Sequence, residues 1–89
     1  MANKAIISAG GFAGDEVTDA DFQASAVKRK MIERATESIP LLDHSKYEFR
    51  LFSTVCHISL LDHLVVDSPP PESLETTLRN TRVQLHIAP

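Results

Sequence analysis

The chain has 89 residues, is 43% hydrophobic and 24% charged, and carries a net charge of −3. This length allows one domain at most, and the acidic balance argues against this chain alone gripping nucleic acid, which usually requires a basic face. The sequence contains no apolar run near the roughly 20 residues of a membrane span, and its N-terminus lacks the apolar core of a signal peptide. We therefore expect a cytoplasmic globular domain without membrane contact.

The cysteine and histidine positions predict neither a disulfide nor a metal site. Cys56 is the single cysteine and stands in the apolar context FSTVCHISLL, so we expect a buried, unreactive thiol. No two histidines have HxxxH or HExxH spacing, which predicts no metal site. No cofactor is expected either. The four histidines are His44, His57, His63 and His86.

The N-terminal stretch predicts a strand, a tight turn and a loop. Residues Lys4–Ala9 (KAIISA) are an apolar run that ends at Gly10 and Gly11, a pattern typical of a buried strand followed by a turn. The glycine pair has two readings of similar weight: a purely structural turn, or backbone N–H groups presented to an anion. No GxGxxG or GxxxxGK[ST] motif accompanies it. Residues Phe12–Thr18 are predicted to form a loop.

A long amphipathic helix is predicted to follow and to run to about Glu37. Asp and Thr side chains before it can cap its start and complement its dipole. Apolar residues recur along it at spacings of three and four, which predicts one buried stripe. The stripe contains Ala20, Ala24, Val27, Met31 and Ala35, with Ile32 beside it. The capping candidates are Thr18, Asp19 and Asp21.

Basic residues cluster on the same helix at Lys28, Arg29 and Lys30, and Arg34 follows one turn later. Glutamates interleave with them. Mixed charge on a helix is typical of a solvated face with i,i+4 ion pairs such as Arg29–Glu33. We therefore expect this cluster to face water.

Three more strands and a second helix are predicted in the remaining sequence. Ile39–Leu42 is a short apolar strand, in which Pro40 cannot donate to a ladder and is expected at the first paired position or on an irregular entry. Leu64–Val66 is apolar throughout, and Val83–Ile87 alternates as a strand with one exposed face does. The helix is expected over Glu72–Asn80, with its apolar positions at i,i+4.

Smaller features complete the prediction. Ser59–Asp62 is expected to form a helical turn, and Tyr47–Thr54 is ambiguous between irregular structure and a turn. Pro71 suits the first turn of the second helix, behind Ser68 or a nearby cap. The order β-α-β-(turn)-β-α-β implies an α/β fold with a parallel sheet and right-handed crossovers.

Polar residues follow the second predicted strand directly, in the order Asp43, His44, Ser45, Lys46. In an open parallel α/β sheet this end of a strand is where ligands bind. A lysine there can meet a phosphate as a point charge, although an exposed loop lysine is the commoner case when the residues alone are weighed. Because catalytic triads converge from separate elements, the adjacent Asp, His and Ser do not predict a nucleophilic site.

Three segments at this spacing, VKRKMIERA, LLDHSKY and LVVDSPPPESL, closely resemble the C-terminal effector domain of the DeoR-type transcriptional repressors. The resemblance extends from about Lys4 to Ile87. It implies a Rossmann-like parallel sheet with flanking helices, similar to the sugar-phosphate isomerase and CoA-transferase fold. It also implies that residues 1–89 are the C-terminal portion of an effector-sensing domain, and that the helix-turn-helix domain that binds DNA is absent.

The resemblance implies roles for individual residues. Lys46 matches the lysine of the family's D-x-S-K motif, which in related isomerases contacts the substrate phosphate. Asp43 and Ser45 match the other polar positions of that motif. Gly10 and Gly11 match the turn after the family's first strand here, and we expect all five to shape one phosphate pocket.

The same resemblance bears on catalysis. Lys28 is one of the expected phosphate-binding residues. A related isomerase would instead need a catalytic glutamate near the positions of Lys28 and Arg29. General acid–base work on a sugar requires such carboxylates, so no catalytic residue is expected and the chain is expected not to be an enzyme. Two departures from the family pattern lie next to the motif: Tyr47 replaces Phe, and Glu48 stands where Gly is common.

The resemblance therefore predicts the effector-sensing and oligomerisation part of a DeoR-type regulator. It would bind a phosphorylated sugar or polyol, and the full-length protein would contact DNA through its other domain. A sugar-phosphate isomerase-like enzyme fragment is the alternative. A homo-oligomer is expected, because a partial sheet leaves edges and an apolar face exposed.

Overall fold

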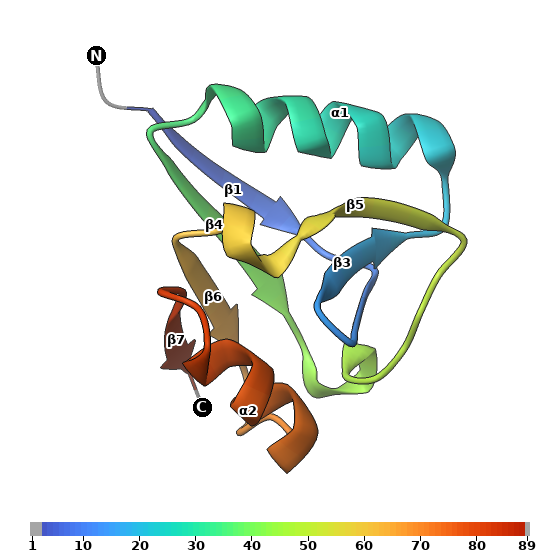
Figure 1. Ribbon diagram of the computed structural model, residues 1–89. Coiled ribbons are helices and arrows are strands. Elements are labelled where there is room, and N and C mark those ends of the chain that lie inside the picture. The colour runs from blue at the N-terminus through green and yellow to red at the C-terminus, as the bar shows by residue number, and fades with distance from the viewer. Residues whose placement is uncertain (1–2, 89) are drawn as a thin grey trace.

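Four parallel strands form the main sheet. In the computed structural model, which describes residues 3–88, β1 (Lys4–Ser8), β4 (Glu37–Leu42), β6 (His63–Val66) and β7 (Gln84–Ile87) lie side by side in that order. All three pairings are parallel. The predicted α/β class and the predicted parallel sheet are confirmed. The strands follow one another across the sheet in their order along the chain (Figure 1).

Two helices connect these strands. Helix α1 (Phe22–Arg34) is capped by Asp21, whose side chain accepts a hydrogen bond from the backbone N–H of Gln23 at 2.9 Å. It ends earlier than predicted, because Ala35 is extended and β4 already begins at Glu37. Helix α2 (Glu72–Arg79) matches its prediction, except that Pro71 takes the cap position without a side-chain cap instead of a place in the first turn.

The predicted buried stripe of α1 is wrong. Val27 is 60% exposed and Met31 is 43% exposed, whereas the buried residues of the helix are Ser25 and Ile32. The helix packs mainly against strands outside the main sheet, and the Ser25 hydroxyl lies 2.6 Å from that of Ser53. This contact rotates the stripe away from the core, where it borders a shallow apolar hollow beside β1.

A second, antiparallel sheet was not predicted. Strands β2 (Gly11–Ala13), β3 (Glu16–Asp19) and β5 (Ser53–His57) pair in the order β2-β3-β5. The prediction of a loop over 12–18 is therefore wrong, and the ambiguous stretch ends in a strand. Strands of three to five residues carry too little alternation to be recognised. Gly14 and Asp15 form the two-residue turn between β2 and β3, and these residue types are equally typical of a loop.

Pro40 lies within β4, a central strand, instead of at its entry. It pairs with Ile7 of β1, while the pairing of β4 with β6 begins only at Leu41. Two residues earlier, the N–H of Ser38 donates to the side chain of Asp62 at 2.9 Å instead of to a β6 carbonyl. Because backbone N–H groups alternate along a strand, the missing N–H of Pro40 falls where β4 and β6 are not yet hydrogen-bonded.

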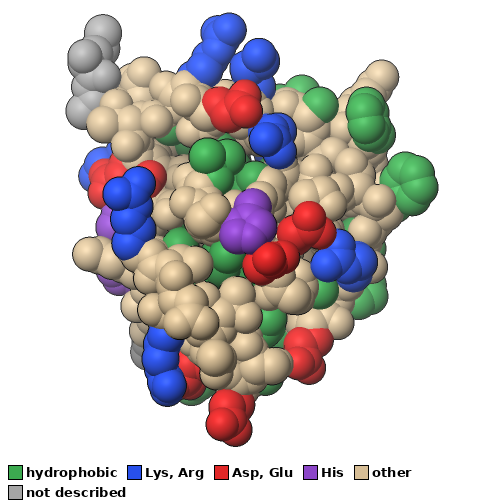
Figure 2. All heavy atoms as spheres, in the orientation of Figure 1, with side chains coloured by type: hydrophobic (Ala, Val, Ile, Leu, Met, Phe, Trp, Pro, Cys, Tyr) green, Lys and Arg blue, Asp and Glu red, His purple; other side chains and the backbone are tan. Residues whose placement is uncertain are grey.

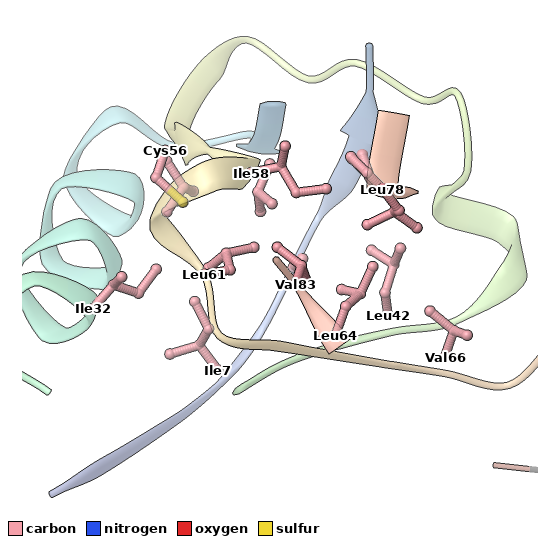
Figure 3. Packing of buried hydrophobic residues seen from close by; sticks show 14 of the residues in the cluster. Ile7, Ile32, Leu42, Cys56, Ile58, Leu61, Leu64, Val66, Leu78 and Val83 are labelled. Atoms are coloured by element: carbon pink, nitrogen blue, oxygen red, sulfur yellow. The ribbon is translucent and has the colours of Figure 1, made fainter. Parts of the chain in front are cut away.

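The hydrophobic core lies between the two sheets and the helices. Buried residues from both sheets and both helices meet there, as Figure 3 shows for Ile7, Ile32 and Leu64 among others. Cys56 is fully buried in this core, as predicted, and burial raises the pKa of its thiol to about 11. The strands of the main sheet contribute the residues on one face only, because burial alternates along β1, β4 and β6.

The other face of the main sheet is more open to solvent. It carries Ile6, Ile39, Leu41 and Val65, of which Ile6 is 59% and Leu41 is 43% exposed. The helical crossovers join strands that follow one another in a single direction across the sheet. Because such crossovers are right-handed, both helices lie on the same face of the sheet. No helix among residues 3–88 is long and apolar enough to cross a membrane.

Candidate functional site at the carboxyl ends of the parallel strands

A cavity of about 610 Å³ opens where β1, β4 and β6 end. It lies at the carboxyl edge of the sheet, the edge at which open α/β sheets bind ligands. Four of the six predicted site residues line it. They come from the β1 turn, from α1 and from the segment after β4: Gly10, Lys28, Asp43 and Lys46.

The segment after β4 forms one turn of 3₁₀ helix, η1 (His44–Lys46). Asp43 caps this turn, because its Oδ1 accepts hydrogen bonds from the backbone N–H of Ser45 at 2.9 Å and from the Ser45 hydroxyl. These hydrogen bonds lower the pKa of the Asp43 carboxyl. Ser45 therefore holds Asp43 and does not line the cavity, whereas Lys46 does.

Lys28 reaches the cavity from α1 and is already bound. Its Nζ donates to the backbone carbonyl of Ser8 at 2.7 Å and to Oδ2 of Asp19 at 2.5 Å. The Lys28 and Asp19 side chains are only 21% and 14% exposed, and the hydrogen bond from Lys28 lowers the pKa of Asp19. The expectation of a fully solvated basic face is wrong for this residue, while the pair of Arg29 with Glu33, at 3.2 Å, is confirmed.

Two side-chain hydrogen bonds join the segments after β4 and β6. The Nδ1 of His44 lies 3.0 Å from Oδ2 of Asp67, which lines the cavity. This hydrogen bond raises the pKa of His44 and lowers that of Asp67. Tyr47 adds a second connection, since its hydroxyl donates to the Ser68 carbonyl at 2.6 Å. Burial, followed by the charge of Asp67, raises the pKa of Tyr47 to about 12.

The two neighbouring glycines have different roles. Gly10 lines the cavity, and its N–H donates to the carbonyl of Thr18 at 3.1 Å, so that amide is occupied within the fold. Gly11 does not line the cavity. A Cβ at Gly11 would lie 2.1 Å from the carbonyl oxygen of Phe49, so this position requires glycine to let the segment after η1 pass.

Lys46 lines this site, and none of the ion pairs among residues 3–88 includes it. Lys28 is matched by Asp19, while Asp43 and Asp67 add negative charge at the rim. On the face of the molecule that Figure 2 shows, basic and acidic side chains are mixed and do not gather into one basic patch. An anionic group entering the cavity would therefore meet its strongest attraction at Lys46.

Sequence reasoning missed two acidic residues of this cavity, Asp19 and Asp67. Asp67 directly follows the β6 strand, so its place at the carboxyl edge of a parallel sheet was a usable signal. Asp19 had no such signal, because the strand that it ends was predicted as a loop. Its partner Lys28 lies nine residues later and on a different element, so the pairing depends on the tertiary structure.

Comparisons with known proteins identify the family of this chain. The family model described as the DeoR C terminal sensor domain matches residues 1–68. The chain is 30% identical over 67 residues to the glycerol-3-phosphate regulon repressor of Escherichia coli, covering 75% of this chain and 27% of that protein. It is 32% identical over 85 residues to the HTH-type transcriptional repressor GlcR of Bacillus subtilis, covering 96% of this chain and 33% of that protein.

The chain spans about a third of the length of these relatives or less. No solved structure matches it. The family model covers most of the chain, including the turn with Asp43 and Lys46 and the end of β6 with Asp67. The chain therefore belongs to the DeoR C-terminal sensor domain family, the effector-sensing domain of transcriptional regulators.

Proposed function

We propose that this chain binds a phosphorylated sugar or polyol in the cavity at the carboxyl ends of β1, β4 and β6. One observation carries the proposal: residues from α1, from the β1 turn and from the segment after β4 line one cavity, and Lys46 stands in it without an ion-pair partner among residues 3–88. The name of one relative, a glycerol-3-phosphate regulon repressor, supports a small phosphorylated compound as the effector.

Lys46 is the residue assigned to the phosphate. Asp43, fixed by Ser45, would position the η1 turn and accept hydrogen bonds from hydroxyl groups of the ligand. Asp67, which follows β6, would accept such hydrogen bonds as well. Lys28 would contribute only if the ligand drew it from Asp19, because its ammonium already binds that carboxylate and the Ser8 carbonyl. Gly10 would form the wall of the cavity, and Gly11 would support it from behind.

The site favours binding over catalysis. The positions near which a related isomerase would need its glutamate hold Lys28 and Arg29, and both side chains are engaged, Lys28 with Asp19 and Arg29 with Glu33. The family and its repressor relatives point to a regulatory sensor. Residues 1–89 would act as the C-terminal portion of that sensor, in a fold related to the sugar-phosphate isomerases, and DNA would be contacted by another domain of the full regulator.

Effector control would act through self-association. The open face of the main sheet exposes Ile6 and Leu41, and all-parallel sheets are almost always covered on both faces. In a homo-oligomer, a second copy of the chain would cover the part of this face around Ile6 and Leu41. Effector binding controls DNA binding only if the effector has different affinities for the DNA-competent and DNA-released states.

The effector proposal is tested by ligand titration of the 89-residue chain and of a full-length regulator that contains it. Glycerol 3-phosphate and a panel of hexose and pentose phosphates should include a compound that raises the melting temperature, whereas free glycerol should not. The Lys46→Ala variant should lose at least tenfold in affinity, because it loses the phosphate's counter-charge. Lys30→Ala, which removes an exposed lysine of α1 outside the cavity, should bind as the parent does.

Two results would contradict the proposal. One is that no phosphorylated compound stabilises either protein. The other is that Lys46→Ala and Lys30→Ala bind the effector equally well. Turnover of a sugar phosphate would instead favour the isomerase-like alternative.

Self-association is tested separately by sedimentation velocity over a concentration series. The chain should form dimers or larger species that Ile6→Lys dissociates, because a charge at this covered position would be desolvated. Phe52→Lys is the matched control, since Phe52 is 86% exposed and lies outside the main sheet. A chain that stays monomeric, or equal dissociation by both variants, would exclude this face as the interface.

A further inference from the structure

Three residues from neighbouring strands form a hydrogen-bonded row on the open face of the main sheet. They are Glu37 of β4, His63 of β6 and His86 of β7. The Nε2 of His63 lies 2.6 Å from Oε2 of Glu37, and its Nδ1 lies 3.0 Å from Nε2 of His86. The row lies beside a hollow of about 300 Å³ that Lys4, Ile39 and Val65 also line.

The row fixes the orientation of the central imidazole. A carboxylate only accepts hydrogen bonds, so the Nε2–H of His63 must donate to Glu37. The lone pair of the other ring nitrogen, Nδ1, then points toward His86. The His63 side chain is only 19% exposed, and packing restricts it further. A histidine that donates to a carboxylate while its second nitrogen faces outward has the arrangement found at metal-bound histidines, where the carboxylate sets the tautomer.

We propose that His63 and His86 bind a divalent copper or nickel ion between Nδ1 of His63 and Nε2 of His86, with Glu37 holding His63 in the coordinating tautomer. Metal–imidazole bonds are about 2.0–2.1 Å long. Two such bonds at 90° place their nitrogens about 2.9 Å apart, close to the 3.0 Å seen here, whereas tetrahedral zinc requires about 3.3 Å. The spacing thus fits neighbouring positions of a tetragonal or octahedral ion.

Binding requires both rings to turn slightly and the His86 ring to change its tautomer, because a lone pair that points along the hydrogen bond does not point at an ion bound to both nitrogens. The Nε2 of His86 must present its lone pair, so the His86 ring carries its proton on Nδ1 in the metal-bound form. The hydrogen bond between the two rings is replaced by two metal–nitrogen bonds. Among residues 3–88, no group of three or more His, Cys, Asp or Glu side chains is arranged to hold a metal ion, so water would complete the coordination shell from the hollow.

The charge of Lys4 limits the affinity of the site. Glu37 is shared with Lys4, whose Nζ lies 3.9 Å from Oε1, so the carboxylate attracts a cation less than it would alone. With two protein ligands and water, we expect micromolar affinity, following copper over nickel and zinc as is general for nitrogen sites. Acid should weaken binding, because protons compete for the same lone pairs.

The site is tested by titrating the 89-residue chain with Cu²⁺ and Ni²⁺ at pH 7.5, following heat release and, for copper, the electron paramagnetic resonance spectrum. One ion should bind per chain, and the copper spectrum should show coupling to two imidazole nitrogens. His86→Ala should weaken binding at least tenfold and lose one nitrogen coupling. Glu37→Gln should weaken binding about 10–100-fold with both nitrogens retained, as outer carboxylates do elsewhere.

His57→Ala is the matched control. His57 is also an exposed histidine that pairs with a carboxylate, Asp15 at 2.9 Å, but it stands alone among the histidines at its position in the second sheet. It should bind both ions as the parent chain does. A circular dichroism spectrum should confirm that each variant folds. The proposal is overturned if no ion binds below millimolar concentration, or if His86→Ala retains the affinity and both nitrogen couplings.

Discussion

Single residues hold this site in place through backbone conformations that the sequence does not reveal. Glu48 adopts a left-handed conformation with φ 55°, directly after the turn that carries Lys46. Its N–H donates to the Phe12 carbonyl at 2.7 Å, which fixes the segment against β2. The DeoR-type pattern commonly has glycine here, and the structure gives the reason: a residue with a Cβ is strained at this φ.

Replacing Glu48 should separate backbone strain from side-chain contacts. Glu48→Gly and Glu48→Ala both lose the hydrogen bond from the Ser73 hydroxyl, at 2.8 Å, but only glycine relieves the strain. We expect the glycine variant to be more stable than the alanine variant by about 1 kcal/mol in urea unfolding. Equal midpoints for the two variants would show that the left-handed backbone costs little here.

The pair of His44 and Asp67 should make stability depend on pH. The pKa of His44 is raised, so its contribution is complete below its ordinary value of 6.5 and is lost as pH rises through the raised value. The pKa of Asp67 is lowered, so its contribution is present above 3.8 and is lost as pH falls through the lowered value. The pair therefore stabilises the fold most in the mildly acidic range between them.

His44→Gln tests this dependence. Melting temperatures from pH 5 to pH 9 should show the largest loss at the acid end of that range and convergence with the parent at the alkaline end. Asp67→Asn should remove the same pH-dependent contribution, because it removes the other member of the pair. A loss that is constant across the range would exclude the ion pair as its cause.

At the scale of elements, the second sheet determines where α1 and the η1 segment lie. The β2–β3 hairpin supplies Asp19 to Lys28, and β5 supplies the Ser53 contact that orients α1. The segment between η1 and β5 crosses close to Gly11. The cavity thus depends on an antiparallel sheet that contributes one lining side chain, Asp19, and otherwise acts by positioning its neighbours.

Alanine substitutions at the two neighbouring glycines should differ sharply. At Gly11 a Cβ would lie 2.1 Å from the Phe49 carbonyl oxygen, a backbone atom that cannot move alone. At Gly10 the closest atom, at 2.6 Å, is the Cδ1 end of the flexible Leu51 side chain. We expect Gly11→Ala to cost more than about 2 kcal/mol and Gly10→Ala distinctly less in urea unfolding. Equal losses would mean that the segment near Phe49 adjusts freely.

At the scale of the whole molecule, one small core joins both sheets. A chain of this size buries only about 60% of its unfolded surface, so its stability is marginal. Leu64 lies in the centre of the core and is 1% exposed, and Cys56 on the second sheet is fully buried in the same cluster. The reaction rate of the Cys56 thiol with a thiol reagent should therefore report the opening of any part of this core.

Cys56 provides the measurement. With its pKa raised to about 11, the thiol is protonated at neutral pH and should react with a thiol reagent only when the fold opens. Leu64→Ala should remove about 2–5 kcal/mol of stability and accelerate labelling in proportion to the open population. Leu60→Ala, at a 42% exposed position, should leave the rate nearly unchanged. Rapid labelling of the parent chain would contradict the burial of Cys56.

The sequence by itself determined the four parallel strands, both helices, a group of capping candidates that includes Asp21, and the family. Those features depend on local patterns: apolar runs, helical spacing, capping residues and motifs of adjacent residues such as Asp43 to Lys46. They also placed Asp43 and Lys46 at the carboxyl edge of the sheet, because a residue just after a parallel strand always lies there.

Only the tertiary structure decided the second sheet, the buried face of α1 and the charge partners. Short strands such as β2 acquire their conformation from pairing, and Val27 and Met31 are exposed because Ser25 meets Ser53 across the chain. The approach of His63 to His86 has the same origin. Twenty-three residues separate them, so their contact follows from the parallel pairing of β6 with β7 and from no spacing in the sequence.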